Sequence, residues 1–233
     1  MLSAIAIVPS APVLVPELAG AAADELAELR AAMVAAVAAL PPRWVVVGVG
    51  SNDAADGVVG PNSVGTFAGF GADLLVRLSP QASENDQPVE FPLCALIAGW
   101  IRAQAQPDAR AQVRVYAENH HAQTALALGR RLRSEIDQAA EPTGVLIVAD
   151  GANTLTPAAP GGYHPADADV QLALDDALAC GDLAALTRLP GQVSGRVAFG
   201  VLAGLAEPAP RSAKELYRAA PYGVGYFAGV WQP

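Results

Sequence analysis

The sequence predicts a single α/β domain over residues 1–233, with a mostly parallel or mixed sheet and helices on both faces. Apolar strand-like and helix-like segments alternate along the whole length, which is typical of strands joined by helices. The runs 44–50 and 144–149 are continuously apolar, as in strands covered on both faces. No internal repeat or linker divides the chain, and its 233 residues suit one α/β domain.

The first elements follow from apolar runs and the residues that end them. Residues 4–8 form an apolar run that Pro9 stops, which predicts a strand. Apolar residues recur at helical spacing over 21–40; acidic residues near the start suit the helix dipole, and Pro41 ends the segment. Residues 73–78 alternate in polarity, which predicts a strand near an edge of the sheet.

The remaining elements continue this alternation. We predict helices over 92–106, 121–139, 167–179 and 192–206, and strands over 112–117 and 144–149. The aromatic and Gly-rich tail, 215–231, predicts a strand, a turn and a second strand. Three irregular loops lie at 51–66, 79–91 and 156–166. Long loops in a compact domain usually belong to a functional site.

The composition excludes several classes of protein. The chain is 52% hydrophobic and 16% charged, and its net charge is −9 without a Lys/Arg cluster. We therefore expect no nucleic-acid partner and no basic membrane-binding surface. No apolar run reaches the roughly 20 residues of a membrane span, and residues 1–15 lack the basic start of a signal peptide. We expect a cytoplasmic protein in which Cys94 and Cys180 are reduced packing thiols.

The segment 145–167 is the strongest candidate for the edge of a pocket. An apolar run ends at Asp150, and a turn-rich loop then brings Asn153, Tyr163 and His164. In an α/β protein, ligands bind where strands end at their carboxyl side.

The segment 48–53 invites a dinucleotide-binding interpretation because two glycines follow a strong strand. That motif needs a third glycine that opens a helix, but Asp53 stands there, and its negative charge would repel phosphate. A polar pocket wall made by Ser51 and Asn52 fits the residues better.

Two adjacent histidines, His120 and His121, follow Glu118 at a predicted strand-to-helix junction. Neighbouring residues of an extended segment point to opposite sides, so one histidine can face a cleft. One interpretation makes it a general base or proton shuttle; the other places one histidine in solvent and one against the sheet. One of them, together with His164 and either Glu118 or Asp150, also has the composition of a two-His-one-carboxylate metal site, without a metal-specific spacing.

Three segments, in order along nearly the whole chain, resemble one known family. Residues 7–18 are similar to a strand followed by a Pro-His-Pro-Pro-like turn, 148–165 to a Ser-Gly-Asp-Leu-Ser-His stretch with its Thr-Pro-x-Ala-Pro-x-Gly-Tyr continuation, and 220–228 to a closing strand. These are features of the class III extradiol ring-cleavage dioxygenase superfamily, which includes the subunit-B-like and Memo-like proteins. The resemblance implies that fold and an acid–base role for the histidine pair at 120–121.

The sequence departs from the family where the family binds ferrous iron. The three metal histidines correspond to Ser10, to Ser51 or Asn52, and to Asn153. The segment 222–226 holds no glutamate, where ring-cleaving members place a carboxylate ligand and Memo-like members a thiol. Serine and asparagine are weak neutral ligands for this ion, so we expect a pocket that persists without its metal.

Two hypotheses follow from these substitutions. The first, which needs fewer assumptions, is a binding or non-catalytic protein that holds a small molecule without a cofactor. The second is an enzyme: either a metal-free one with His120 or His121 as base and Asp150 as orienting group, or a ring-cleavage oxidoreductase that binds Fe²⁺ or Zn²⁺ through relocated histidines. The expected substrate contacts are Ser10, Ser51, Asn52, Asn153, His164 and Tyr222. A homo-oligomer stays open, because the aromatic tail can form either an interface or core.

Overall fold

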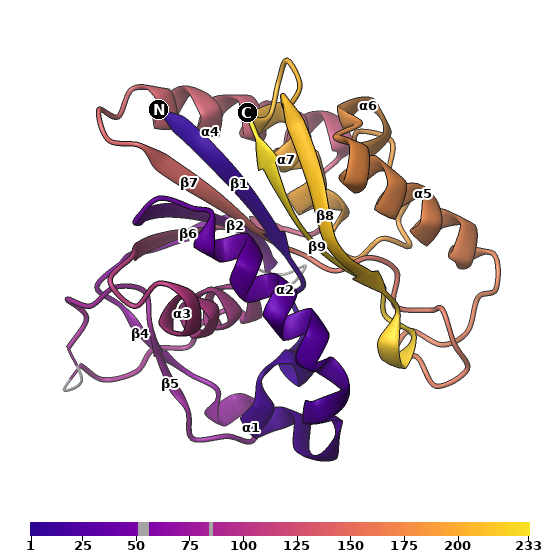
Figure 1. Ribbon diagram of the computed structural model, residues 1–233, viewed down its shortest axis with the longest axis horizontal. Helices are drawn as coiled ribbons and strands as arrows, with labels where there is room; N and C mark the ends of the chain where they lie inside the picture. Colours follow the sequence, from indigo (N-terminus) through magenta and orange to yellow (C-terminus); the bar gives the residue numbers. More distant parts are fainter. Residues whose placement is uncertain (51–55, 84–85) are drawn as a thin grey trace.

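The computed structural model describes residues 1–50, 56–83 and 86–233 (Figure 1). In this part of the chain a seven-stranded sheet has the order β3-β6-β2-β7-β1-β9-β8. The strands are β1 (Leu2–Val8), β2 (Arg43–Gly50), β3 (Gly57–Val59), β6 (Arg110–Ala117), β7 (Thr143–Val148), β8 (Ser212–Ala219) and β9 (Tyr226–Gln232). The predicted α/β class is confirmed.

The four neighbouring strands β6, β2, β7 and β1 are parallel. The outer strands β3, β9 and β8 pair antiparallel, so the sheet is mixed. Because parallel strands end at the same edge, the carboxyl ends of β1, β2, β6 and β7 lie on one side of the domain. This edge carries most of the residues singled out in the sequence.

Helices cover both faces of the sheet, as predicted (Figure 1). On one face lie α2 (Ala27–Ala38) and α3 (Leu93–Ala105); on the other lie α4 (Ala122–Asp137), α5 (Asp167–Cys180), α6 (Leu183–Leu186) and α7 (Arg196–Leu205). The short elements are α1 (Pro16–Ala19) and the 3-10 turns η1 (Pro12–Leu14), η2 (Gly20–Leu26), η3 (Ala68–Phe70) and η4 (Pro221–Gly223). No helix of the described residues is long and apolar enough to cross a membrane.

Each central strand contributes to two hydrophobic cores. In β1, Ala6 and Val8 face the α2–α3 side, whereas Ile5 and Ile7 face the α4–α7 side. Burial on both faces explains why these strands are continuously apolar in sequence. The tail adds to both cores: Tyr226 packs on the first side, and Trp231 on the second.

Several predicted boundaries were wrong. The strand expected at 73–78 is shorter, β5 (Leu75–Arg77), and it pairs with β4 (Val64–Thr66) in a separate two-stranded sheet. The helix expected over 21–40 starts as the 3-10 turn η2. The helix expected from 192 begins at Arg196, because the segment before it forms turns. The four-residue helix α6 was not predicted.

Candidate functional site

Two adjoining cavities lie at the edge where the parallel strands end. Their volumes are 210 and 340 Å³, and both are lined by Ser10, Asp150 and Ser194. Glu118 lines the smaller cavity, whereas Asn153 and Tyr226 line the larger one. We call the two together the strand-end cavity.

The floor of this cavity is the junction of β1 and β7. Pro9 ends β1, and the Ala149 amide continues the pairing by donating to the Val8 carbonyl at 3.0 Å. The next residue, Asp150, turns its carboxylate toward the loop after β1, where Oδ1 accepts a 2.7 Å hydrogen bond from the Ser10 amide. Two segments that are 140 residues apart are thereby joined at the cavity.

The loop after Asp150 is held by backbone contacts that require glycine. Gly151 donates to the Gly225 carbonyl at 2.9 Å, and Gly225 donates to the Ala152 carbonyl at 2.8 Å. The buried side chain of Gln171 lies against both glycines and accepts from the Ala152 amide at 2.8 Å. A Cβ on either glycine would come within 2.1 Å of the Gln171 side chain. The approach of α5 therefore fixes the course of the site loop.

The acidity of Asp150 is the unusual electrostatic property of the site. Burial raises its pKa from the ordinary 3.8 to about 7, although the hydrogen bond from the Ser10 amide lowers it in part. The side chain itself is half-buried and lines the cavity. Near neutral pH this group exists as both carboxylate and carboxylic acid, so it can accept or donate a hydrogen bond.

Besides the carboxylates of Asp150 and Glu118, the cavity has four neutral polar side chains without a hydrogen-bond partner among the described residues. Among the described residues, no hydrogen bond is formed by the hydroxyls of Ser10, Ser194 and Tyr226 or by the side-chain amide of Asn153. Burial and the charge of Asp150 raise the pKa of Tyr226, so its phenol stays protonated. The arrangement can hydrogen-bond a ligand from several sides without adding charge.

The structure places the two adjacent histidines outside the lining of the strand-end cavity. His120 Nε2 lies 2.7 Å from Asp56 Oδ1, an acidic partner that the sequence interpretation missed. Arg196 holds this segment by donating to the carbonyls of His120 at 2.9 Å and Glu118 at 2.8 Å. His121 is exposed and precedes the first turn of α4. Among the described residues, no hydrogen bond or ion pair joins either histidine to Asp150, so the structure does not bring the predicted base and orienting group together.

Of the remaining residues that were predicted to contact a substrate, Tyr222 lines the cavity and His164 does not. Tyr222 lines the larger cavity from its outer side, and its hydroxyl donates to the Glu25 carboxylate. His164 is exposed and does not line the cavity, although its amide donates to the Thr154 carbonyl at 2.9 Å. Ser51 and Asn52 lie outside the described residues.

Two polar residues that line the cavity, Ser194 and Tyr226, were not predicted as ligand contacts. Ser194 was assigned to a helix, and Tyr226 was assigned to the closing strand as core or interface. A signal for Ser194 exists, because Pro190-Gly191 predicts a break and Ser194-Gly195 precedes the true start of α7.

The donor atoms do not fit the ferrous iron that the family resemblance implies. Ser10 and Asn153 offer neutral oxygens where the family has histidines. Among the described residues, no three His, Cys, Asp or Glu side chains are grouped as a metal would require. The two-His-one-carboxylate set that the sequence composition allowed is therefore not assembled there.

Comparison with known proteins supports the fold. No protein-family model matches the chain, and no curated protein matches it in sequence. The crystal structure of the uncharacterized protein JW3007 from Escherichia coli K12 is similar, with a TM-score of 0.58 and 10% sequence identity. The match covers 99% of this chain and 100% of that one. At this identity the likeness concerns the fold alone.

Proposed function

We propose that the protein binds a small hydroxylated aromatic molecule in the strand-end cavity, without a metal and without transforming it. The observation that carries this proposal is the carboxyl group of Asp150, with a pKa of about 7, which lines the larger of the two cavities together with neutral polar side chains. A phenolic hydroxyl can donate to this group, while Ser10 and Asn153 supply further hydrogen bonds.

The apolar lining of the larger cavity supports the same class of ligand. Apolar side chains such as Val13 and Val224 line the larger cavity together with the ring of Tyr226. Pockets that bind small molecules are typically apolar with a few placed polar groups. The resemblance to the extradiol dioxygenase superfamily favours an aromatic ligand as well, while the substituted ligand positions favour loss of the iron chemistry.

Catechol binding at pH 8 to chelator-treated protein tests this proposal by isothermal titration calorimetry. We expect saturable binding that Asp150→Asn weakens about tenfold or more, because a hydrogen bond to a charged group contributes about 1.5–3 kcal/mol. Asp108→Asn, which neutralises an exposed carboxylate in the turn before β6, at the opposite end of the parallel strands, is the matched control and should bind like the wild type. Equal affinities in all three proteins would contradict the role given to Asp150.

A second candidate is a metal-free acid–base enzyme, and the pKa of Asp150 is the observation that favours it. A group that titrates near the working pH is suited to proton transfer. Turnover of a hydroxylated aromatic that Asp150→Asn abolishes would support this candidate. Loss of turnover in His120→Ala and His121→Ala would instead support the histidine-based enzyme. Tight stoichiometric binding of ferrous iron with cleavage of catechol would contradict both metal-free alternatives.

A further inference from the structure

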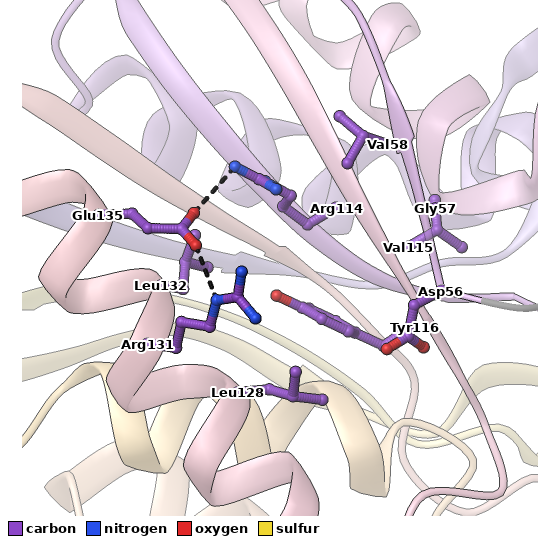
Figure 2. Close-up of a pocket in the computed structure, with 10 residues that line it drawn as sticks. All are labelled: Asp56, Gly57, Val58, Arg114, Val115, Tyr116, Leu128, Arg131, Leu132 and Glu135. Carbon is purple, nitrogen blue, oxygen red and sulfur yellow. Dashed lines mark hydrogen bonds and ion pairs between the residues drawn. The ribbon is translucent and has the colours of Figure 1, made fainter.

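A further cavity lies at the end of the sheet formed by the edge strand β3, between α4 and the strands β3 and β6 (Figure 2). Its volume is 260 Å³. We call it the edge cavity; its lining comes from three elements, with Val58 on β3, Arg114 and Tyr116 on β6, and Leu128, Arg131 and Glu135 on α4. None of them lines the strand-end cavity.

Two arginines in the edge cavity share one carboxylate. Glu135 Oε2 accepts from Arg114 Nη2 at 3.0 Å, and its Oε1 accepts from Arg131 Nε at 3.1 Å (Figure 2). One negative charge is thus set against two positive charges. Both Nη groups of Arg131 remain without a protein acceptor among the described residues. The cluster therefore has more hydrogen-bond donors than acceptors.

Tyr116 adds a further donor from the sheet. The residue is only 8% exposed, yet Figure 2 shows its hydroxyl pointing into the cavity toward Arg131. This hydroxyl forms no hydrogen bond with any residue that the structure describes. Burial raises the pKa of Tyr116, so the phenol stays protonated and can donate. The side chain is buried, but its hydroxyl opens into the cavity without a protein acceptor among the described residues, so it is available to a ligand there.

A second carboxylate, that of Asp56, also lines the edge cavity, so two acidic and two basic side chains face it. Asp56 Oδ1 lies 2.7 Å from His120 Nε2 and also accepts from the Ala117 amide at 3.0 Å. Among the described residues, no hydrogen bond joins Asp56 to Tyr116 or Arg131.

We propose that the edge cavity binds a small organic carboxylate, independently of the strand-end cavity. The carboxylate group accepts from the Tyr116 hydroxyl and from Arg131, since guanidinium and carboxylate geometries match. The apolar body of the ligand lies against Val58, Leu128 and Leu132. The volume is below the roughly 300–1,000 Å³ of common ligand pockets, which limits the ligand to a single ring or short chain. The net charge of −9 gives no general attraction for anions, so binding depends on this local cluster.

The test is calorimetric titration with benzoate, with its neutral analogue benzamide, and with inorganic phosphate. We expect saturable binding of benzoate, no saturation with benzamide, and weaker binding of phosphate, which has no apolar body. Tyr116→Phe and Arg131→Gln should each weaken benzoate binding about tenfold or more. Both substitutions are close in shape to the original residue, so the fold is retained.

Arg188→Gln is the matched control, because it removes one positive charge from an exposed position elsewhere. It should bind benzoate like the wild type. The tyrosine-dependent binding should also persist in Asp150→Asn, which separates the edge cavity from the strand-end cavity. Absence of saturable benzoate binding, or equal affinities in Tyr116→Phe, Arg131→Gln and the wild type, would overturn the proposal. Tighter binding of phosphate than of benzoate would overturn the assignment to organic carboxylates.

Discussion

The carboxylate of Asp150 accepts a 2.7 Å hydrogen bond from the backbone amide of Ser10, which joins the ends of two parallel strands. The bond uses Oδ1 and leaves Oδ2 without a protein donor among the described residues. The position of the carboxyl group is therefore set by the fold, and its second oxygen is available to a ligand. Such preorganisation lowers the entropic cost of binding.

The raised pKa of Asp150 predicts that Asp150→Asn stabilises the protein at alkaline pH. An acid whose folded pKa lies above its unfolded value binds more protons when folded, so wild-type stability falls as pH rises from about 4 to about 7. We expect the variant to gain about 2–4 kcal/mol at pH 8. Urea unfolding from about pH 3 to pH 8 measures this difference.

The same experiment contains its own control, because the gain should disappear below the unfolded pKa, where both proteins carry a neutral group. Asn can still accept from the Ser10 amide, so the loop geometry is kept. A difference independent of pH, or a variant that is less stable at pH 8, would show that burial does not raise this pKa.

Gln171 is predicted to be a positioning residue for the strand-end cavity. Its side chain accepts from the Ala152 amide and donates to Asp175 Oδ1 at 2.8 Å, and all three groups are buried. Gln171→Leu leaves two buried groups without partners, which we expect to cost about 2–3 kcal/mol in the free energy of unfolding. The variant should also bind catechol more weakly, because Asp150 and Asn153 flank this loop.

Gln123→Leu makes the same change at an exposed position of α4 and should alter neither stability nor affinity appreciably. Urea unfolding and calorimetry give the two readouts. If Gln171→Leu behaved like this control, the loop would not depend on the contact with α5.

The crossing of α4 and α7 depends on two glycines. A Cβ on Gly129 would lie 2.1 Å from the Val201 carbonyl oxygen, and one on Gly204 would lie 2.1 Å from the Leu126 carbonyl oxygen. We expect Gly129→Ala to destabilise by about 3 kcal/mol, because the two helix backbones must separate. In an isolated helix, replacing Gly by Ala stabilises the helix. Destabilisation of the protein by Gly129→Ala would therefore identify the close helix crossing as its cause.

Gly191→Ala serves as the reference for the glycine substitution, since a Cβ there meets nothing within 4 Å. Thermal unfolding of both variants checks the prediction. A Gly129→Ala protein as stable as Gly191→Ala would mean that the helices have room to move apart.

Local sequence patterns were sufficient for most helices and for the sheet except β3, which lies in the segment 51–66 that was predicted to be a loop. The runs that became β2 and β7 are apolar because both of their faces are buried, and this property is visible without knowing the fold. The alternation at 73–78 indicated one buried face, but it carries no information on which strand is the partner. The strand β5 therefore entered a separate sheet with β4.

The candidate site was predictable only as far as strand ends determine it. Ser10, Asp150 and Asn153 line one cavity because they follow parallel strands, which is a general rule. The direction in which the His120 side chain points was not predictable, because its partner Asp56 is 64 residues away along the sequence. The contribution of Ser194 depends on the exact start of α7, and helix boundaries are the least determined part of a sequence pattern.

The most direct test of the account is the pH dependence of catechol affinity in the chelator-treated wild-type protein. The carboxylate form of Asp150 accepts a hydrogen bond from a phenol more strongly than the acid form does. We predict that affinity rises about tenfold between pH 5.5 and 8, with a midpoint near the pKa of about 7, and that Asp150→Asn abolishes this dependence. Affinity that does not change with pH, or binding that occurs only after ferrous iron is added, would contradict a metal-free site built around Asp150.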